Sequence, residues 1–209
     1  MDGQTFVEEI RSDKRTELDR LASEKALLAV TRADLSAGTI LETVALTLEG
    51  LRATLEEWAG ETAAGPAREA FAEGVAALGE ERERIGAQLD AEPAGDPPAP
   101  VPTVREFEGT PERVGAAFVG HGLVFDGVLL QAVSFFVNEA ERGRADLVRD
   151  LRSGASERVD EGGATLEAVC ADADDWERAD SAARAVVGAA YEDYRETLAG
   201  MGIDPKPVC

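Results

Sequence analysis

The chain has 209 residues and a formal net charge of −21, because 42 acidic residues stand against 21 lysines and arginines. This balance argues against direct nucleic-acid binding, since no basic stripe is available to contact phosphates. A compact domain with this charge repels itself unless salt screens the repulsion. The spread of acids from Asp2 to Asp204 therefore predicts a halophilic protein that folds in molar salt.

Helical periodicity dominates the sequence and predicts an all-α bundle. The first helix is expected over about 5–30, where apolar residues recur on one stripe and the other face is charged. The second follows the turn signal at 33–36 and runs to Ala59. A third begins at Pro66, which suits the first turn of a helix, and ends near residue 90.

Residues 91–109 contain five prolines, which exclude regular helix and predict an extended crossover. A fourth helix restarts at Thr110, which can serve as its N-cap. This helix is the most apolar part of the chain, and it is long enough to suggest a membrane span. His121 and Asp126 lie inside it, so a helix buried at the centre of a bundle or at a dimer seam is the preferred interpretation.

The burial of the fourth helix is expected on several sides, since its large apolar residues spread around it and its glycines let neighbouring backbones approach. The apolar residues are Val119, Leu123, Leu130 and Phe136, and the glycines are Gly115, Gly120, Gly122 and Gly127.

Two more helices follow. The fifth is expected over about 144–170, with a kink or break at 162–163 because two glycines cost about 2 kcal/mol relative to two alanines. The sixth starts in the acidic cluster at 172–175 and ends near Gly200. The whole chain, 1–209, is thus predicted to be one domain with two three-helix halves, 1–90 and 110–209, joined by the crossover.

His121 is the only histidine, and with Asp126 it forms the candidate ligand-binding pair. The simpler interpretation is a core histidine satisfied by Asp126 or by a backbone carbonyl. If a metal were bound, its carboxylate ligands would be Glu49, Glu80 and Glu81. Two of these glutamates have an arginine three residues further along the chain, Glu49 with Arg52 and Glu81 with Arg84. They are explained more simply as members of surface ion pairs.

The two cysteines, Cys170 and Cys209, give neither a disulfide framework nor a zinc knuckle, and they lack the partners of a nucleophile. Low cysteine usage and an acidic, amphipathic start without a secretory signal predict a cytoplasmic location. No cofactor motif is present, so no cofactor is expected.

Four stretches resemble a haloarchaeal family of rubrerythrin-like or ferritin-like helical proteins, some of which carry a transcription antitermination label. They are TELDRLASEKALLAVTRADL (16–35), LEEWA (55–59), VSFFVNEAERGRADLVRDLR (133–152) and the ending from DDWERA to GIDPKPVC (174–209). The resemblance implies a ferritin-like multi-helix bundle. In that family a Glu-His pair recurs on the second and third helices, whereas here the matching places hold Leu48-Glu49 and Glu80-Glu81.

Because those histidines are missing, we expect a non-catalytic bundle that acts through association with a protein partner or a second copy of itself, without a membrane. Two alternatives stay open. One is a rubrerythrin-like oxidoreductase that binds a metal or a cofactor near His121, and the other is a transcription antitermination accessory factor.

Overall fold

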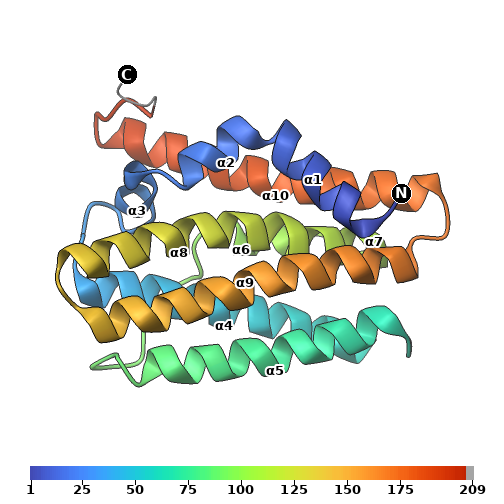
Figure 1. Ribbon diagram of the computed structural model, residues 1–209, viewed down its shortest axis with the longest axis horizontal. Helices are drawn as coiled ribbons and strands as arrows, with labels where there is room; N and C mark the ends of the chain where they lie inside the picture. The colour runs from blue at the N-terminus through green and yellow to red at the C-terminus, as the bar shows by residue number, and fades with distance from the viewer. Residues whose placement is uncertain (206–209) are drawn as a thin grey trace.

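The structure is a computed structural model that describes residues 1–205, and within this range every regular element is helical. Two helical hairpins, α4–α5 and α8–α9, form its body, and α10 packs along the helix that begins at Thr110 (Figure 1). The predicted all-α bundle is confirmed. The long elements are α4 (Ala37–Glu61), α5 (Pro66–Gly86), α8 (His121–Asn138), α9 (Arg142–Val169) and α10 (Ala173–Gly200).

The N-terminal segment is three short helices rather than the single helix expected over 5–30. The chain leaves helical geometry at Lys14 and again at Ala22 and Ser23, where Ser23 is extended with φ −92° and ψ 164°. These bends let the segment follow the surface of α9 and α10 instead of projecting from the bundle. The helices are α1 (Gly3–Asp13), α2 (Arg15–Leu21) and α3 (Glu24–Val30).

These three helices pack on the C-terminal part of the chain. α1 lies against α9, whereas α2 and α3 lie against α10 and α8. The N-terminal half therefore does not make a three-helix unit of its own, because its first segment completes the core of the other half. The apolar side chains of α1, Phe6 and Ile10, are buried in that shared core.

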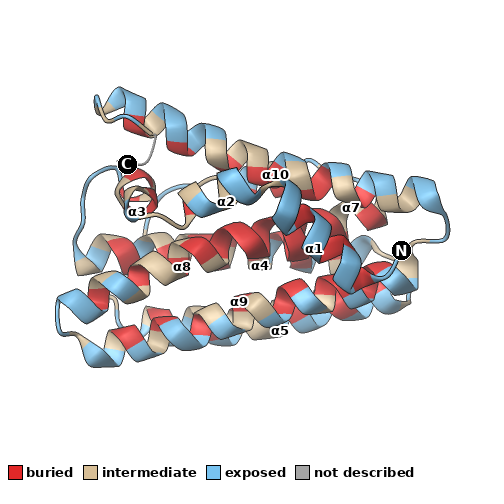
Figure 2. Cartoon of the chain, turned by 45° about the horizontal axis from the view of Figure 1, so that its top comes forward, coloured by how far each residue is buried: buried red, intermediate tan, exposed pale blue. Residues whose placement is uncertain are grey.

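The predicted fourth helix is a continuous run of α7 (Thr110–Val114), the π-helical turn η1 (Gly115–Gly120) and α8. Gly109, and not Thr110, is its N-cap, so that expectation was wrong by one residue. The run is long and apolar enough to cross a membrane, but 67% of its most apolar window is buried inside the protein. Figure 2 shows the buried residues along it, in agreement with the interpretation as a core helix.

Two glycines of this run do bring backbones together. A Cβ added at Gly115 would lie 2.5 Å from the carbonyl oxygen of Ala179, and one at Gly120 would lie 2.7 Å from that of Ala183. Both carbonyls belong to α10, so the small residues set the distance between these helices.

Three of the four apolar residues expected in the core are buried, namely Val119, Leu123 and Phe136. Leu130 is only half-buried, because it lies one helical turn beyond Asp126 on the side of α8 that reaches the surface. Its neighbour Leu129 takes the core position and is fully buried.

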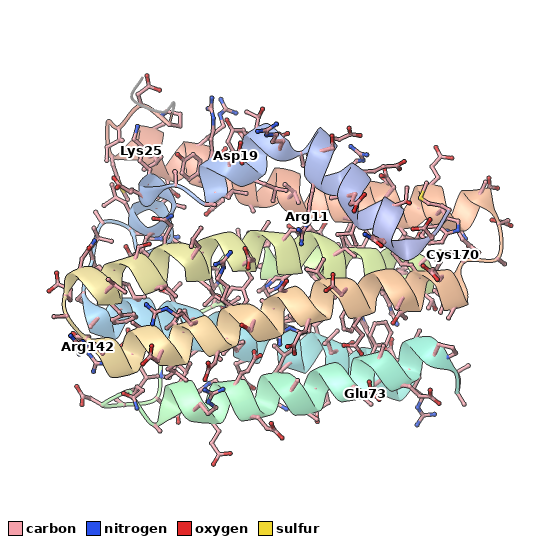
Figure 3. The ribbon with its side chains drawn as sticks, viewed as in Figure 1. Arg11, Asp19, Lys25, Glu73, Arg142 and Cys170 are labelled. Carbon is pink, nitrogen blue, oxygen red and sulfur yellow. The ribbon has the colours of Figure 1, made fainter. Side chains whose placement is uncertain are left out.

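A kink or break was expected at 162–163, and the break is absent, because α9 is one uninterrupted helix from Arg142 to Val169 (Figure 3). The two glycines are explained by packing. A Cβ at Gly162 would lie 2.5 Å from Cβ of Phe118, and one at Gly163 would lie 2.9 Å from the carbonyl oxygen of Gly3. The cost in helix propensity is offset by the close approach of η1 and α1.

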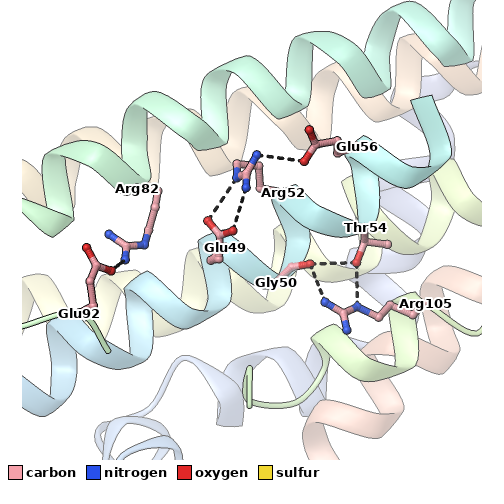
Figure 4. A network of polar contacts seen from close by, with 8 residues as sticks. All are labelled: Glu49, Gly50, Arg52, Thr54, Glu56, Arg82, Glu92 and Arg105. Atoms are coloured by element: carbon pink, nitrogen blue, oxygen red, sulfur yellow. Dashed lines mark hydrogen bonds and ion pairs between the residues drawn. The ribbon is translucent and has the colours of Figure 1, made fainter. Parts of the chain in front are cut away.

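The crossover contains one turn of helix, α6 (Val101–Val104), which packs on α4 and also contacts α10. Arg105 donates from Nε to Thr54 Oγ1 over 3.0 Å and from Nη2 to the Gly50 carbonyl over 3.2 Å (Figure 4). Val101 is fully buried against Gly50. The expected crossover is thus present, but the exclusion of regular helix was wrong, because the chain forms one helical turn with Pro102 near its N-terminal end.

Candidate functional site

A buried ion pair links the two hairpins. Nη1 of Arg158 on α9 donates to Oε1 of Glu81 on α5 over 2.7 Å, and the two side chains are only 7% and 11% exposed. Glu81 lies on the apolar stripe of α5 between Leu78 and Ile85, so the helix packing that buries those residues buries the carboxylate too.

The packing around the ion pair leaves little space for a larger side chain on the facing helix. Gly154, one turn before Arg158 on α9, faces Glu81, and a Cβ there would overlap the carboxylate. His121 begins α8 directly after the π-helical turn and is 2% exposed. The charge of Arg158 acts on the pKa of His121 as well as on that of Glu81. Since turns of π-helix occur often at functional sites, we take Glu81, Arg158 and His121, hereafter the core cluster, as the candidate site.

Burial dominates the electrostatics of the core cluster. Desolvation raises the pKa of Glu81, although the hydrogen bond and positive charge of Arg158 oppose this effect. Desolvation and then the charge of Arg158 lower the pKa of His121 to about 3, so the imidazole is neutral at physiological pH. A buried neutral imidazole beside a guanidinium is therefore unsuited to proton transfer near pH 7.

The structure does not join the predicted pair of His121 and Asp126. Asp126 accepts two hydrogen bonds from Arg152, from Nε over 2.9 Å and from Nη2 over 3.2 Å, at the half-exposed edge between α8 and α9. His121 points into the core, and its Nε2 has no hydrogen-bond partner among the described residues. Of the two partners expected for a core histidine, Asp126 is therefore wrong, because five residues along a helix turn the two side chains to different faces.

The three candidate carboxylates are not brought together either. Glu49 is bound by Arg52, as predicted, and Glu56 binds the same arginine (Figure 4). Glu80 is exposed and Glu81 lies in the core cluster. Within residues 1–205 no three histidines, cysteines, aspartates or glutamates are grouped so as to hold a metal.

The expected pair of Glu81 with Arg84 is wrong. Arg84 instead binds Asp150 of α9 across the helix interface, with Nη2 and Oδ2 2.7 Å apart. Glu80 lies on the exposed face of α5, whereas the next residue, Glu81, points into the core. The partner of Glu81 there comes from a distant part of the sequence.

The residues of the core cluster do not fit a cation site. Only one carboxylate and one imidazole are present, and the buried guanidinium beside them already supplies the positive charge that a metal would bring. The arginine is thus the group that balances the charge of the buried carboxylate.

Cys170 lies at the C-terminal end of α9 (Figure 3). Burial and then the charge of Asp175 raise the pKa of its thiol to about 11, which leaves it protonated and unreactive near neutral pH. Cys209 lies outside the described residues.

Sequence reasoning missed Arg158 as a core residue. The signal was present, because Arg158 falls on the apolar stripe of its helix with Ala155, Val159 and Gly162. A charged residue at a core position on each of two helices, with opposite signs, indicates a buried ion pair.

Comparison of the chain with protein-family models, with characterised proteins and with solved structures gives no significant match.

Proposed function

We propose that the chain is a non-catalytic helical bundle of ferritin-like character, in which an internal arginine stands where a metal would balance the core carboxylate. The arrangement of two helical hairpins around one long crossover supports this likeness, since ferritin-like folds carry one such connection. The observation that carries the proposal is the hydrogen bond of Arg158 to Glu81 in the core.

Such a bundle acts through contacts with another macromolecule, and we propose that this is a protein partner in the cytoplasm. The net charge of −21 disfavours nucleic acid as the partner. Among the described residues only Met1, Leu35 and Val137 are large hydrophobic side chains that are exposed. So few apolar groups favour a polar contact with a different protein over an obligate apolar homodimer.

Two measurements on the native protein test this function. Elemental analysis after purification without added metal is expected to find no stoichiometric iron, zinc or manganese. One or two such atoms per chain would instead support the metal-dependent oxidoreductase. The carboxylates to substitute in that case are Glu49, Glu80 and Glu81.

Co-purification at molar KCl is expected to recover a defined protein partner in constant ratio, while light scattering of the isolated chain gives the mass of a monomer. Recovery of RNA polymerase or elongation components would favour the antitermination accessory factor. A stable dimer with no partner would contradict the proposed association with a different protein.

A further inference from the structure

A cavity of about 580 Å³ lies where the end of α5 meets the start of α9, at the end of the bundle where α8 turns into α9 (Figure 1). Three arginines and one acidic residue line it, which gives a local charge of +2 in a chain whose net charge is −21. The residues that matter here are Arg84, Gln88, Glu141, Arg142, Arg144 and Leu147.

Two of the arginines are held in place by carboxylates. Nη2 of Arg84 lies 2.7 Å from Oδ2 of Asp150, and Nη1 of Arg144 lies 2.6 Å from Oε2 of Glu141. Each of these contacts uses one nitrogen of a guanidinium that carries five N–H donors. The ion pairs therefore fix both side chains at the cavity and still leave donors for a ligand.

The remaining donors of the cavity are not engaged. The side chains of Arg142 and Gln88 form no hydrogen bond or ion pair within residues 1–205. Figure 3 labels Arg142 at the exposed start of α9. Nothing lies within 4 Å of a Cβ added at Gly143, the next residue, so a ligand can approach the backbone closely beside the arginines.

We propose that this cavity binds the phosphate monoester of a small organic compound, with the phosphate on the arginines and the organic part against Leu147. The guanidinium fork matches the oxygens of a phosphate group. A phosphate monoester carries a charge of about −1.5 to −2 near neutral pH, which the local charge of +2 balances, whereas a carboxylate carries only −1.

The size of the cavity favours an ester over inorganic phosphate. Ligand sites of about 300–1,000 Å³ hold small organic molecules, so a cavity of about 580 Å³ has space for more than a phosphate group. One such cavity is not the row of phosphate contacts that a nucleic acid needs, so the acidic balance of the chain still disfavours nucleic acid.

Molar salt does not abolish this recognition. At 1 M the screening length is about 3 Å, so the repulsion of a phosphate by the distant carboxylates of the protein is suppressed. Hydrogen bonds from the arginines act at shorter range, in direct contact with the phosphate oxygens, and they persist.

Calorimetric titration of the whole chain in 1 M KCl tests the site, with phenyl phosphate and inorganic phosphate as the two probes. Arg142→Gln is expected to weaken the binding of phenyl phosphate by at least about tenfold, because a hydrogen bond to a charged group is lost. Arg68→Gln is the matched control, since Arg68 is equally exposed and lies about 24 Å from Arg84 along α5. It is expected to leave the binding unchanged.

Two further results support the assignment: tighter binding of phenyl phosphate than of inorganic phosphate, and the largest ligand-induced amide NMR shifts at residues 142–144. The absence of saturable binding of phenyl phosphate overturns the proposal. So does an equal loss of affinity in the two variants, or binding of inorganic phosphate at least as tight as that of the ester. If Arg142→Gln does not fold, the location of the amide shifts in the wild-type protein decides.

Discussion

At the scale of single residues, the pair of Arg158 and Glu81 gives the sharpest prediction. Arg158→Met leaves the Glu81 carboxylate buried without its partner, and we expect unfolding free energy to fall by about 3–5 kcal/mol. The double variant Arg158→Met, Glu81→Leu removes both charges and is expected to recover most of this loss. Urea titration at constant molar KCl measures both variants. A double variant as unstable as the single one contradicts the assignment of the cost to an uncompensated charge.

The neutral state of His121 predicts a second effect. Its pKa of about 3 in the folded protein lies below the ordinary histidine value of 6.5, so below pH 6.5 the unfolded chain binds a proton that the folded chain does not. Stability is therefore lost as the pH falls from 6.5 towards 3, by about 1.4 kcal/mol per pH unit, or about 2 kcal/mol at pH 5.

His121→Phe removes this titration. The difference in unfolding free energy between wild type and variant, measured at pH 7 and at pH 5, isolates the histidine from the carboxylates that both proteins share. Parallel pH profiles for the two proteins would show that His121 is protonated while the protein is folded.

At the scale of elements, glycines determine how closely the helices approach. Gly120→Ala places a Cβ 2.7 Å from the Ala183 carbonyl, a backbone atom that cannot move without shifting α10. We expect a loss of about 1–3 kcal/mol. Gly188→Ala in α10 is the matched control, because nothing lies within 4 Å of the added carbon.

The control is expected to stabilise the protein by up to about 1 kcal/mol through helix propensity. Thermal melts of the two variants therefore move in opposite directions. Two melting temperatures that both rise would mean that the contact between η1 and α10 is loose at this point.

The same elements show what the sequence could predict. The turn signal at 33–36 and the acidic cluster at 172–175 marked the starts of α4 and α10 to within a few residues, because each contains the residue that caps the helix, Ser36 or Asp172. The glycine pair in α9 was misread, because helix propensity is a local property and the contact with Gly3 that offsets it is not.

Long-range pairing limited the prediction of the candidate site in the same way. Glu81 could be paired with Arg84 from spacing alone, whereas its actual partner is 77 residues away along the chain. His121 was correctly placed in a buried helix, but the face on which it lies depended on how α8 and α9 pack. The local sequence pattern predicts which residues are buried better than it predicts which buried residues contact one another.

At the scale of the whole molecule, the charge of −21 predicts that folding depends on salt. The screening length falls from about 10 Å at 0.1 M to about 3 Å at 1 M, which weakens repulsion between carboxylates on neighbouring helices. The melting temperature followed by circular dichroism is expected to rise steeply over this range of KCl. An uncharged osmolyte is the control, and a flat profile in KCl contradicts the halophilic interpretation.

The docking of α1 on α9 also has a consequence for synthesis of the chain. Gly3 donates its backbone N–H to Glu167, 164 residues further on, over 2.5 Å. At about 5–20 residues per second, α1 leaves the ribosome roughly 8–33 s before its binding site exists. During that interval Phe6 and Ile10 have no native surface to cover them, so the nascent chain must keep an apolar segment soluble through the charged face of the same helix.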